Sequence, residues 1–396
     1  MNGTIYMPVG EVCSSISDTY REKKNMVTLI NTSDVLEGRV LNHERVPNSN
    51  LKGQFKKTFQ RDDILYSEIR PQNRRFAYVD FSPIDYIAST KLMVIRAKKD
   101  VVSPKYLYYF LKNSSTVAEL QLLAETRSGT FPQITFSEVA NLTIPVPSLA
   151  VQEVIVQTMQ CLEDKITCNE QINDNLQQQA AAIFRSWFVD CAPFGGKAPD
   201  EWENVTLEDI TALVSRGITP KYADDTDQIV INQKCIRNHT IDLSLARTHT
   251  PKIINEKWLR FGDLLINSTG DGTLGRAAQV WFQPKNLTVD SHVTIARPAK
   301  ENLIFYIGLW GILHEKEIES LHTGSTGQTE LPRDRVKAME LLLPDNETLD
   351  RFNGLITPMA AAIVANQEEN NRLAALRDAI LPKLMSGEID VTDIQL

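Results

Sequence analysis

The chain has 396 residues, 42% of them hydrophobic, and a formal net charge of −8. This length and apolar content predict two or three globular domains and exclude a disordered chain. The acidic balance argues against a nonspecific coat on nucleic acid, but it leaves room for local basic faces.

Residues 5–147 form a first block of mixed strand and helix character. Strands rich in β-branched and aromatic residues are predicted at 26–35, 62–70, 75–81 and 91–97. Helices are predicted at 104–113 and 114–125. A polar loop at 128–135 follows, and a pair of prolines then ends the block.

A long helix is predicted at 150–189, because neither glycine nor proline interrupts it. At about 1.5 Å per residue it is roughly 55–60 Å long. Apolar side chains recur along it at alternating steps of four and three, which is a coiled-coil seam with a polar middle. The seam comprises Ile155, Met159, Leu162, Ile166, Asn169, Asn173, Leu176 and Ile183. A linker rich in proline and glycine follows at 190–202.

The same seam returns in a second helix, predicted at 347–385, in which Pro382 is expected to kink or end the helix. Its members are Phe352, Ile356, Met359, Ile363, Asn366, Asn370, Leu373 and Ile380. Residues 203–344 also repeat the plan of the first block, whereas the loops between matched segments differ. We interpret the chain as an internal duplication whose loops have diverged, a pattern expected when loops carry two specificities on one frame.

The asparagines of the two seams predict a register device. Antiparallel packing of the helices would bring them together near the middle, where paired amides fix the register at some cost in stability. The alternative is that they face solvent or a partner.

Basic and amide side chains in both blocks form a candidate DNA-binding set. Cations contact phosphate groups, while Asn and Gln bind adenine and Arg binds guanine through paired hydrogen bonds. A basic cluster interleaved with aromatic residues covers 51–75, and two polar loops, 127–133 and 323–329, hold matching positions. For any single lysine, a solvated loop is the simpler interpretation. The candidates are Lys52, Lys56, Lys57, Arg61, Arg70, Arg74, Arg75, Arg127, Gln133, Arg216, Lys221, Lys234, Arg237, Asn238, Arg276, Thr326 and Gln328.

Residues 270–275 fit the pattern GxGxxG after a predicted strand. A dinucleotide site needs a helix immediately afterwards, but residues 276–282 have the character of a strand. A tight glycine-rich hairpin is therefore favoured over a nucleotide site. The sequence has no HExxH, phosphate-loop, GxSxG or methyltransferase tetrapeptide motif, so neither a catalytic residue nor a metal site is expected.

Targeting signals are not expected either. The first residues lack a basic start followed by an apolar stretch, and no apolar run reaches the length of a membrane span. The five cysteines form no CxxC pair and are an odd number, which predicts reduced thiols in a cytoplasm.

Together these features resemble the DNA-specificity subunit of type I restriction-modification systems. The segments that carry the resemblance are DDILYSEIR and GDLLINSTG, GSTGQTELPRDRVKAMELLLP, and the terminal LAALRDAILPKLMSGEIDV. The resemblance covers essentially the whole chain and implies an α+β fold. Two duplicated mixed α/β target-recognition domains would each precede a long helix, and the helices would form an antiparallel coiled-coil spacer with pseudo-twofold symmetry.

The resemblance also implies domain boundaries and partners. The first target-recognition domain would span 1–147, the central helix 148–190, the second target-recognition domain 191–345, and the C-terminal helix and tail 346–396. A subunit of this kind is non-catalytic and reads a bipartite double-stranded DNA site for phage defence. Two methyltransferase subunits would bind the helical spacer, and motor-nuclease subunits could join them. S-adenosylmethionine would lie on the methyltransferase, with no cofactor in this chain. A coiled-coil adaptor without DNA reading and a nucleotide-binding enzyme using 270–275 are the alternatives.

Overall fold

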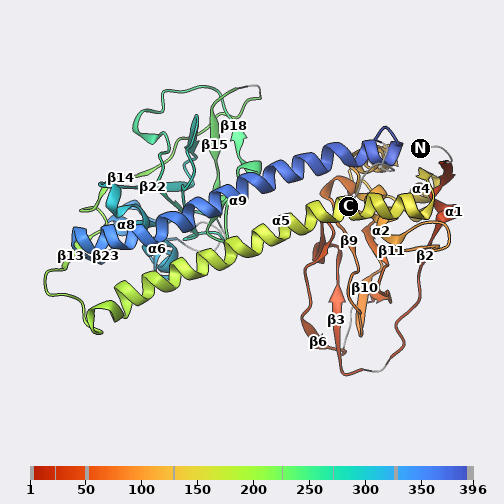
Figure 1. Cartoon of the computed structure of the whole chain (residues 1–396), viewed down its shortest axis with the longest axis horizontal. Coiled ribbons are helices and arrows are strands. Elements are labelled where there is room, and N and C mark those ends of the chain that lie inside the picture. Colours follow the sequence, from red (N-terminus) through yellow and green to blue (C-terminus); the bar gives the residue numbers. More distant parts are fainter. Residues whose placement is uncertain are drawn as a thin grey trace. The chain divides into compact units, whose positions relative to one another are not determined.

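The computed structural model describes residues 4–22, 24–49, 53–127, 130–224, 226–270, 272–324 and 329–389. The chain divides into two compact units. Unit 1 comprises Met1–Thr167 and Asn370–Leu396, and unit 2 comprises Cys168–Glu369. Each unit therefore holds one block of strands and short helices together with stretches of both long helices (Figure 1).

Unit 1 contains two four-stranded sheets and a short terminal pair. The central sheet has the order β2-β11-β8-β9 with antiparallel neighbours, and the outer sheet has the order β6-β3-β10-β7 with one parallel pair, β3 with β10. The central strands are β2 (Cys13–Ile16), β8 (Ile64–Ser67), β9 (Phe76–Tyr78) and β11 (Leu92–Ala97). The outer strands are β3 (Met26–Ile30), β6 (Arg45–Pro47), β7 (Phe55–Lys57) and β10 (Tyr86–Ser89). The terminal pair is β1 (Ile5–Pro8) with β12 (Thr143–Val146), and a hairpin joins β4 (Val35–Leu36) to β5 (Arg39–Val40).

The central sheet of unit 1 is buried on both faces. Alternate side chains of β8 point to opposite sides of the sheet. Ile64 and Tyr66 pack in the core that also contains helix α2 (Pro104–Lys112), whereas Leu65 packs in the core shared with the outer sheet. Helices α1 (Val9–Val12), α3 (Ser114–Arg127) and α4 (Phe136–Asn141) complete the helical side.

Unit 2 repeats this plan. Its central sheet has the order β14-β22-β19-β20 and its outer sheet the order β18-β15-β21, in which β15 and β21 are parallel. The strands are β13 (Glu203–Thr206), β14 (Thr211–Arg216), β15 (Ile229–Ile231), β16 (Ile236–Arg237), β17 (Thr240–Ile241), β18 (Arg247–Thr248), β19 (Leu264–Asn267), β20 (Ala277–Gln279), β21 (Leu287–Val289), β22 (Val293–Pro298) and β23 (Glu340–Leu343). The short helices are α6 (Ile304–Leu313), α7 (Glu315–Ser320) and α8 (Arg333–Lys337). The predicted α+β class and the predicted duplication are both confirmed.

A buried ion pair recurs at the same place in both units. In unit 1, Asp63 accepts two hydrogen bonds of 2.7 Å from Arg96, and in unit 2, Asp263 accepts bonds of 2.8 and 2.7 Å from Arg297. Each aspartate precedes the third strand of the order and each arginine lies on the second. A bidentate guanidinium–carboxylate pair requires a specific geometry. Its recurrence at equivalent positions therefore supports the duplication independently of the strand order.

The sequence-based strands differ from the observed ones mainly in length. The predicted strand at 26–35 is two strands, β3 and β4, separated by a 3-10 turn at Thr32–Asp34. The side chain of Asn31 accepts a 2.9 Å hydrogen bond from the backbone N–H of Thr32, which starts that turn and interrupts the strand. The predicted helices at 104–113 and 114–125 are α2 and α3.

Two long helices are present, α5 (Leu149–Phe184) and α9 (Asn346–Ser386). The helix predicted to reach residue 189 changes after Phe184 into a single π turn, Arg185–Val189. Helix α9 continues through Pro382 to Ser386, so this proline does not end the helix, whose bounds lie within one residue of the predicted 347–385. No helix in the described ranges is long and apolar enough to cross a membrane.

The long helices lie side by side and antiparallel within each unit (Figure 1). In unit 2, Asn169 donates a 2.7 Å hydrogen bond to Glu369, and Asn366 donates a 2.8 Å hydrogen bond to Asn173. The higher-numbered residue of α5 thus pairs with the lower-numbered residue of α9, as expected for antiparallel helices. In unit 1, Asn370 donates to the backbone carbonyl of Ile166 at 3.4 Å.

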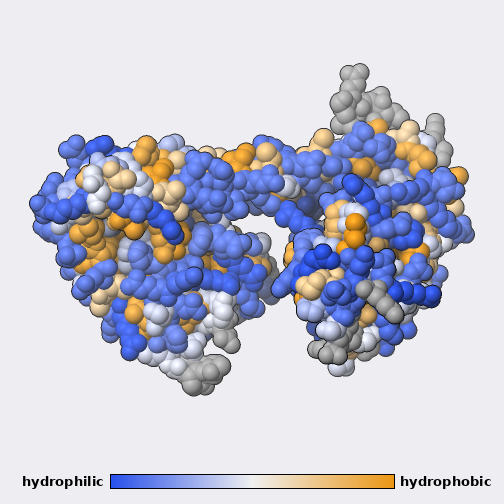
Figure 2. Space-filling model, turned by 90° about the horizontal axis from the view of Figure 1, so that it is seen from below, coloured by the Kyte–Doolittle hydropathy of each residue, from blue (hydrophilic) through white to orange (hydrophobic). Residues whose placement is uncertain are grey.

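The two ends of the seam belong to separate cores. Ile155 and Met159 are fully buried in the core of unit 1, and Phe352 and Ile356 are fully buried in that of unit 2. The remaining seam residues, Leu162, Ile166, Leu176, Ile183, Met359, Leu373 and Ile380, are partly buried, and Ile363 is buried. The face of the molecule seen in Figure 2 is mainly hydrophilic, with scattered hydrophobic patches.

Candidate nucleic-acid interface

Loops gather at one end of the central sheet in each unit, here called the loop end. In unit 1, β2 and β8 finish there while β9 and β11 begin there, which places residues 68–75 and 89–91 together. In unit 2, the matching strands bring 268–270, 272–276 and 290–292 together. The antiparallel order of the strands therefore builds the same loop end twice.

The predicted recognition loops attach to these loop ends. In unit 1, the N–H of Ile134 donates to the carbonyl of Glu68 at 2.9 Å, and that of Arg70 donates to Pro132 at 3.1 Å. In unit 2, the N–H of Leu331 donates to Ser268 at 2.8 Å. Backbone hydrogen bonds thus attach the described residues that flank each loop to the loop end.

Lys91 is the centre of the loop end in unit 1. Its ammonium lies 3.4 Å from a carboxylate oxygen of Glu68 and 3.3 Å from the amide oxygen of Gln133. Lys57 lies beside it and donates to the carbonyls of Thr90 and Leu92 at 3.1 and 2.8 Å. Burial lowers the pKa of Lys57. Lys57 therefore secures the loop, while Lys91, about half exposed, faces outward.

Three candidate arginines flank this loop end with different roles. Arg74 donates to the hydroxyl of Ser114 at 3.0 Å, and Arg75 donates to the carbonyl of Ser33 at 2.9 Å. Both guanidinium groups are thus engaged in holding the fold. Arg70 is exposed and has a left-handed backbone with φ 44°.

The loop end of unit 2 carries other side chains. Arg216 donates to the carbonyl of Leu331 at 2.8 Å and forms an ion pair with Glu330. Thr269 donates a 3.1 Å hydrogen bond to Gln233, and its hydroxyl lies 2.7 Å from Nδ1 of His292. His292 itself is exposed. Polar groups of a different kind thus occupy the equivalent surface.

The structure places the DNA-binding candidates in several regions. Lys57, Arg70, Arg74, Arg75 and Gln133 in unit 1, and Arg216 and Arg276 in unit 2, lie at the loop ends. Arg127 pairs with Glu138 at 2.7 Å at the end of α3. Lys56 lies on strand β7, and Arg61 lies at the opposite end of the central sheet. Lys221 lies in the segment before β15, Lys234 in the 3-10 turn Gln233–Cys235, and Arg237 and Asn238 in the β16–β17 hairpin. Lys52, Thr326 and Gln328 lie outside the described residues.

Sequence reasoning did not single out Lys91 or His292. Each is the residue immediately before a central strand, β11 or β22. The available signal was the alignment of KLMVIRA with HVTIARP between the two blocks, in which a polar side chain precedes the same strand. An isolated histidine without a second ligand at metal spacing gave no reason to select it.

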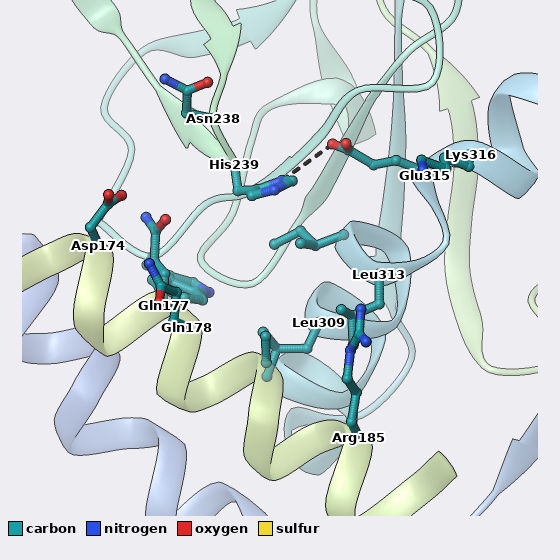
Figure 3. A pocket seen from close by; sticks show the side chains of 13 residues that line it. Asp174, Gln177, Gln178, Arg185, Asn238, His239, Leu309, Leu313, Glu315 and Lys316 are labelled. Atoms are coloured by element: carbon teal, nitrogen blue, oxygen red, sulfur yellow. Dashed lines mark ion pairs between the residues drawn. The ribbon is translucent and has the colours of Figure 1, made fainter.

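Unit 2 also contains a pocket of about 560 Å³ between α5, α6 and the β16–β17 hairpin. Figure 3 shows His239 and Glu315 facing each other at its side, with Nδ1 and Oε1 3.3 Å apart. The hydrogen bond to Glu315 raises the pKa of His239, against the opposing effect of desolvation. The carboxylate also accepts a 2.6 Å hydrogen bond from the N–H of Ala277, so the pair braces the hairpin. The candidate Asn238 lines this pocket and not the loop end.

The glycine-rich segment after β19 is a turn between antiparallel strands. Gly270, Gly272 and Gly275 have positive φ, and β20 follows in antiparallel pairing with β19. The helix that a dinucleotide-binding loop requires is therefore replaced by a strand, as the hairpin interpretation predicts. Among the described residues no group of acidic, histidine or cysteine side chains could hold a metal ion.

Known proteins are similar to this chain in sequence and in fold. Residues 6–178 match the family described as "Type I restriction modification DNA specificity domain". The HindI specificity subunit of Haemophilus influenzae is 29% identical over an alignment of 439 positions, which covers 92% of this chain and 94% of that protein. This chain is therefore similar to type I DNA-specificity subunits. Another relative, the MjaIX specificity subunit of Methanocaldococcus jannaschii, is 26% identical over 348 residues, covering 79% of this chain and 77% of its own length. The S subunit of a type I system from M. genitalium has the same fold, with a TM-score of 0.55 at 14% identity over 97% of both chains.

Proposed function

We propose that this chain is the DNA sequence-specificity subunit of a type I restriction-modification complex. Its target-recognition domains, residues 1–147 and 191–345, each read one half of a bipartite double-stranded site. The observation that carries the proposal is that two frames with the same strand order and the same buried ion pair present different side chains at equivalent loop ends. A duplicated scaffold with divergent loops suits two different half-sites.

Binding to DNA would combine two kinds of contact. Exposed cations such as Lys56, Arg70 and Lys221 suit phosphate contacts, which fix position without sequence information. Polar groups at the loop ends suit base edges in the major groove. Because this chain has a net charge of −8, partner subunits would supply the remaining positive surface.

The helical segments, 148–190 and 346–396, would serve as spacer and docking surface. Two methyltransferase subunits bind there, S-adenosylmethionine is held by those subunits, and motor-nuclease subunits join the assembly. Exposed polar side chains on α5, including Gln157, Asp164 and Gln178, support an outward docking face. This chain contributes specificity and no chemistry of its own.

The decisive experiment is to express the chain with and without its methyltransferase partner and to sequence DNA methylation genome-wide. Methylation at one bipartite motif is expected only when both are present. The purified chain is expected to methylate nothing, and methylation by the chain alone would refute the proposal. An insertion of one helical turn in both α5 and α9 should change the gap between the half-sites and preserve both half-sequences. An unchanged gap would refute the spacer role.

A further inference from the structure

One position is structurally equivalent in the two units and chemically different. Leu92 of β11 pairs with Ser67 of β8, and Val293 of β22 pairs with Asn267 of β19 in the same register. The residue immediately before each paired strand is Lys91 in unit 1 and His292 in unit 2. Both side chains are exposed at the loop end, beside the attached recognition loop. The frame therefore holds two different groups at one place.

In unit 2 the neighbours of His292 determine which of its ring nitrogens carries the proton. The hydroxyl of Thr269 has one hydrogen, and it donates that hydrogen to Gln233 at 3.1 Å. Toward Nδ1 of His292, 2.7 Å away, the same oxygen can only accept. Nδ1 therefore carries the proton in the neutral ring, and Nε2 is left as an acceptor. Within the described part of the chain no group hydrogen-bonds to Nε2.

In unit 1 the equivalent group can only donate. An ammonium has three N–H donors and no acceptor. Glu68 and Gln133 hold Lys91 at 3.4 and 3.3 Å, which orients the side chain and leaves donor capacity outward. The two units thus present opposite hydrogen-bonding roles, a donor at Lys91 and an acceptor at His292.

We propose that this position reads a base in each half-site, an inference that rests on the proposed function. His292 accepts a hydrogen bond from the exocyclic amino group of adenine or cytosine, the only donors on base edges in the major groove. Lys91 donates to O6 or N7 of guanine, which present acceptors there. Thr269 and Gln233 are positioning residues, because they fix the tautomer of His292 without reaching the base.

The first test is the methylation motif in cells that express the chain with its methyltransferase partner. His292→Ala is expected to make one base of one half-site degenerate and to leave the other half-site unchanged. Lys91→Ala is expected to do the converse, so each variant is the control for the other. An unchanged motif in both variants, with methylation intact, overturns the inference alone. Absence of methylation with the unmodified chain overturns the proposed function and the inference together.

The second test measures binding of the assembled complex to duplexes that carry the motif. Each amino-bearing base of the half-site that His292→Ala alters is replaced in turn, adenine by purine and cytosine by 2-pyrimidinone. At one position the loss of the amino group should weaken binding of the unmodified complex about 3- to 10-fold, the effect of a single hydrogen bond. The same replacement should have no effect on His292→Ala. The responding analogue shows whether adenine or cytosine is read, and equal effects on both proteins at every position overturn the inference.

Thr269→Val tests the positioning role. It removes the hydroxyl that holds Nδ1 but leaves His292 in place, so the ring can present either nitrogen. Discrimination between the amino-bearing base and its analogue should fall while binding to the unaltered half-site stays constant. Full retention of discrimination would overturn the assignment of the acceptor through Thr269.

Discussion

Removal of Asp263 should destabilise unit 2 more than removal of Asp63 destabilises unit 1. The side chains of both aspartates are almost fully buried, and each holds an arginine through both of its oxygens. The arginines differ, because the side chain of Arg297 is 7% exposed and that of Arg96 is 31% exposed. An arginine that loses its carboxylate can recover hydration only where water reaches it.

The expected magnitudes follow from that difference. Breaking a buried pair from one side costs about 3–5 kcal/mol, because it leaves a buried charge uncompensated. Arg297 keeps hydrogen bonds to the carbonyls of Glu256 and Trp258 at 2.8 and 2.7 Å, which places Asp263→Ala near the lower end, about 3 kcal/mol. Asp63→Ala should cost about 1–2 kcal/mol, because solvent replaces part of the lost interaction.

The assay must report on each unit separately, since two units need not unfold in one two-state step. Native-state hydrogen exchange of amides in β19 and β22, compared with those in β8 and β11, provides the local free energies of opening. The double variant Asp263→Leu with Arg297→Met is the control, because an apolar pair of similar size is often neutral to stability. Equal losses in the two units, or a double variant as unstable as Asp263→Ala, would refute the reasoning.

Other predictions concern the helices, a titrating pair and the thiols. Asn366→Ala leaves the buried Asn173 without its 2.8 Å amide partner and should lower the local free energy of opening by about 1–3 kcal/mol. Amide hydrogen exchange in α5 measures this loss, and a loss below about 0.5 kcal/mol, the low end for one hydrogen bond, would contradict the prediction. Glu315 raises the pKa of His239, so this pair stabilises the fold fully below the unfolded pKa of about 6.5 and loses that contribution as pH rises through the folded value. Glu315→Gln should lower the pKa in an NMR titration of the ring, and an unmoved pKa would exclude Glu315 as the cause. Exposed Cys161 and Cys168 should be alkylated rapidly by iodoacetamide, whereas Cys13 should react slowly because burial raises its pKa to about 12; mass spectrometry of the folded chain separates these outcomes.

The frame was predictable because its signals are local and repeated. β-branched and aromatic residues mark β8, β9 and β11, and the 4-3 spacing with its asparagines marks both long helices. The break after β3 was not predicted, because it depends on one Asn31 side chain binding the backbone. The π turn after Phe184 likewise has no periodic signature.

The loop ends were predictable only in part, because they combine segments far apart in sequence. Composition identified Arg70 and Arg75 as cations of one cluster. Only the fold separates exposed Arg70 from Arg75, whose guanidinium is bonded to the carbonyl of Ser33. Lys91 joins Glu68 and Gln133 from three segments, and no sequence window contains all of them.

The discontinuity of unit 1 has a consequence for synthesis. Its core includes Leu381, Leu384 and Met385, which pack with residues from the first half of the chain. Unit 2 is continuous in sequence and is translated between the two parts of unit 1. At about 5–20 residues per second, the first block waits on the order of tens of seconds for its closing helix. On the ribosome, the part made first is therefore the part completed last, and a truncation late in the sequence damages the domain encoded at its beginning.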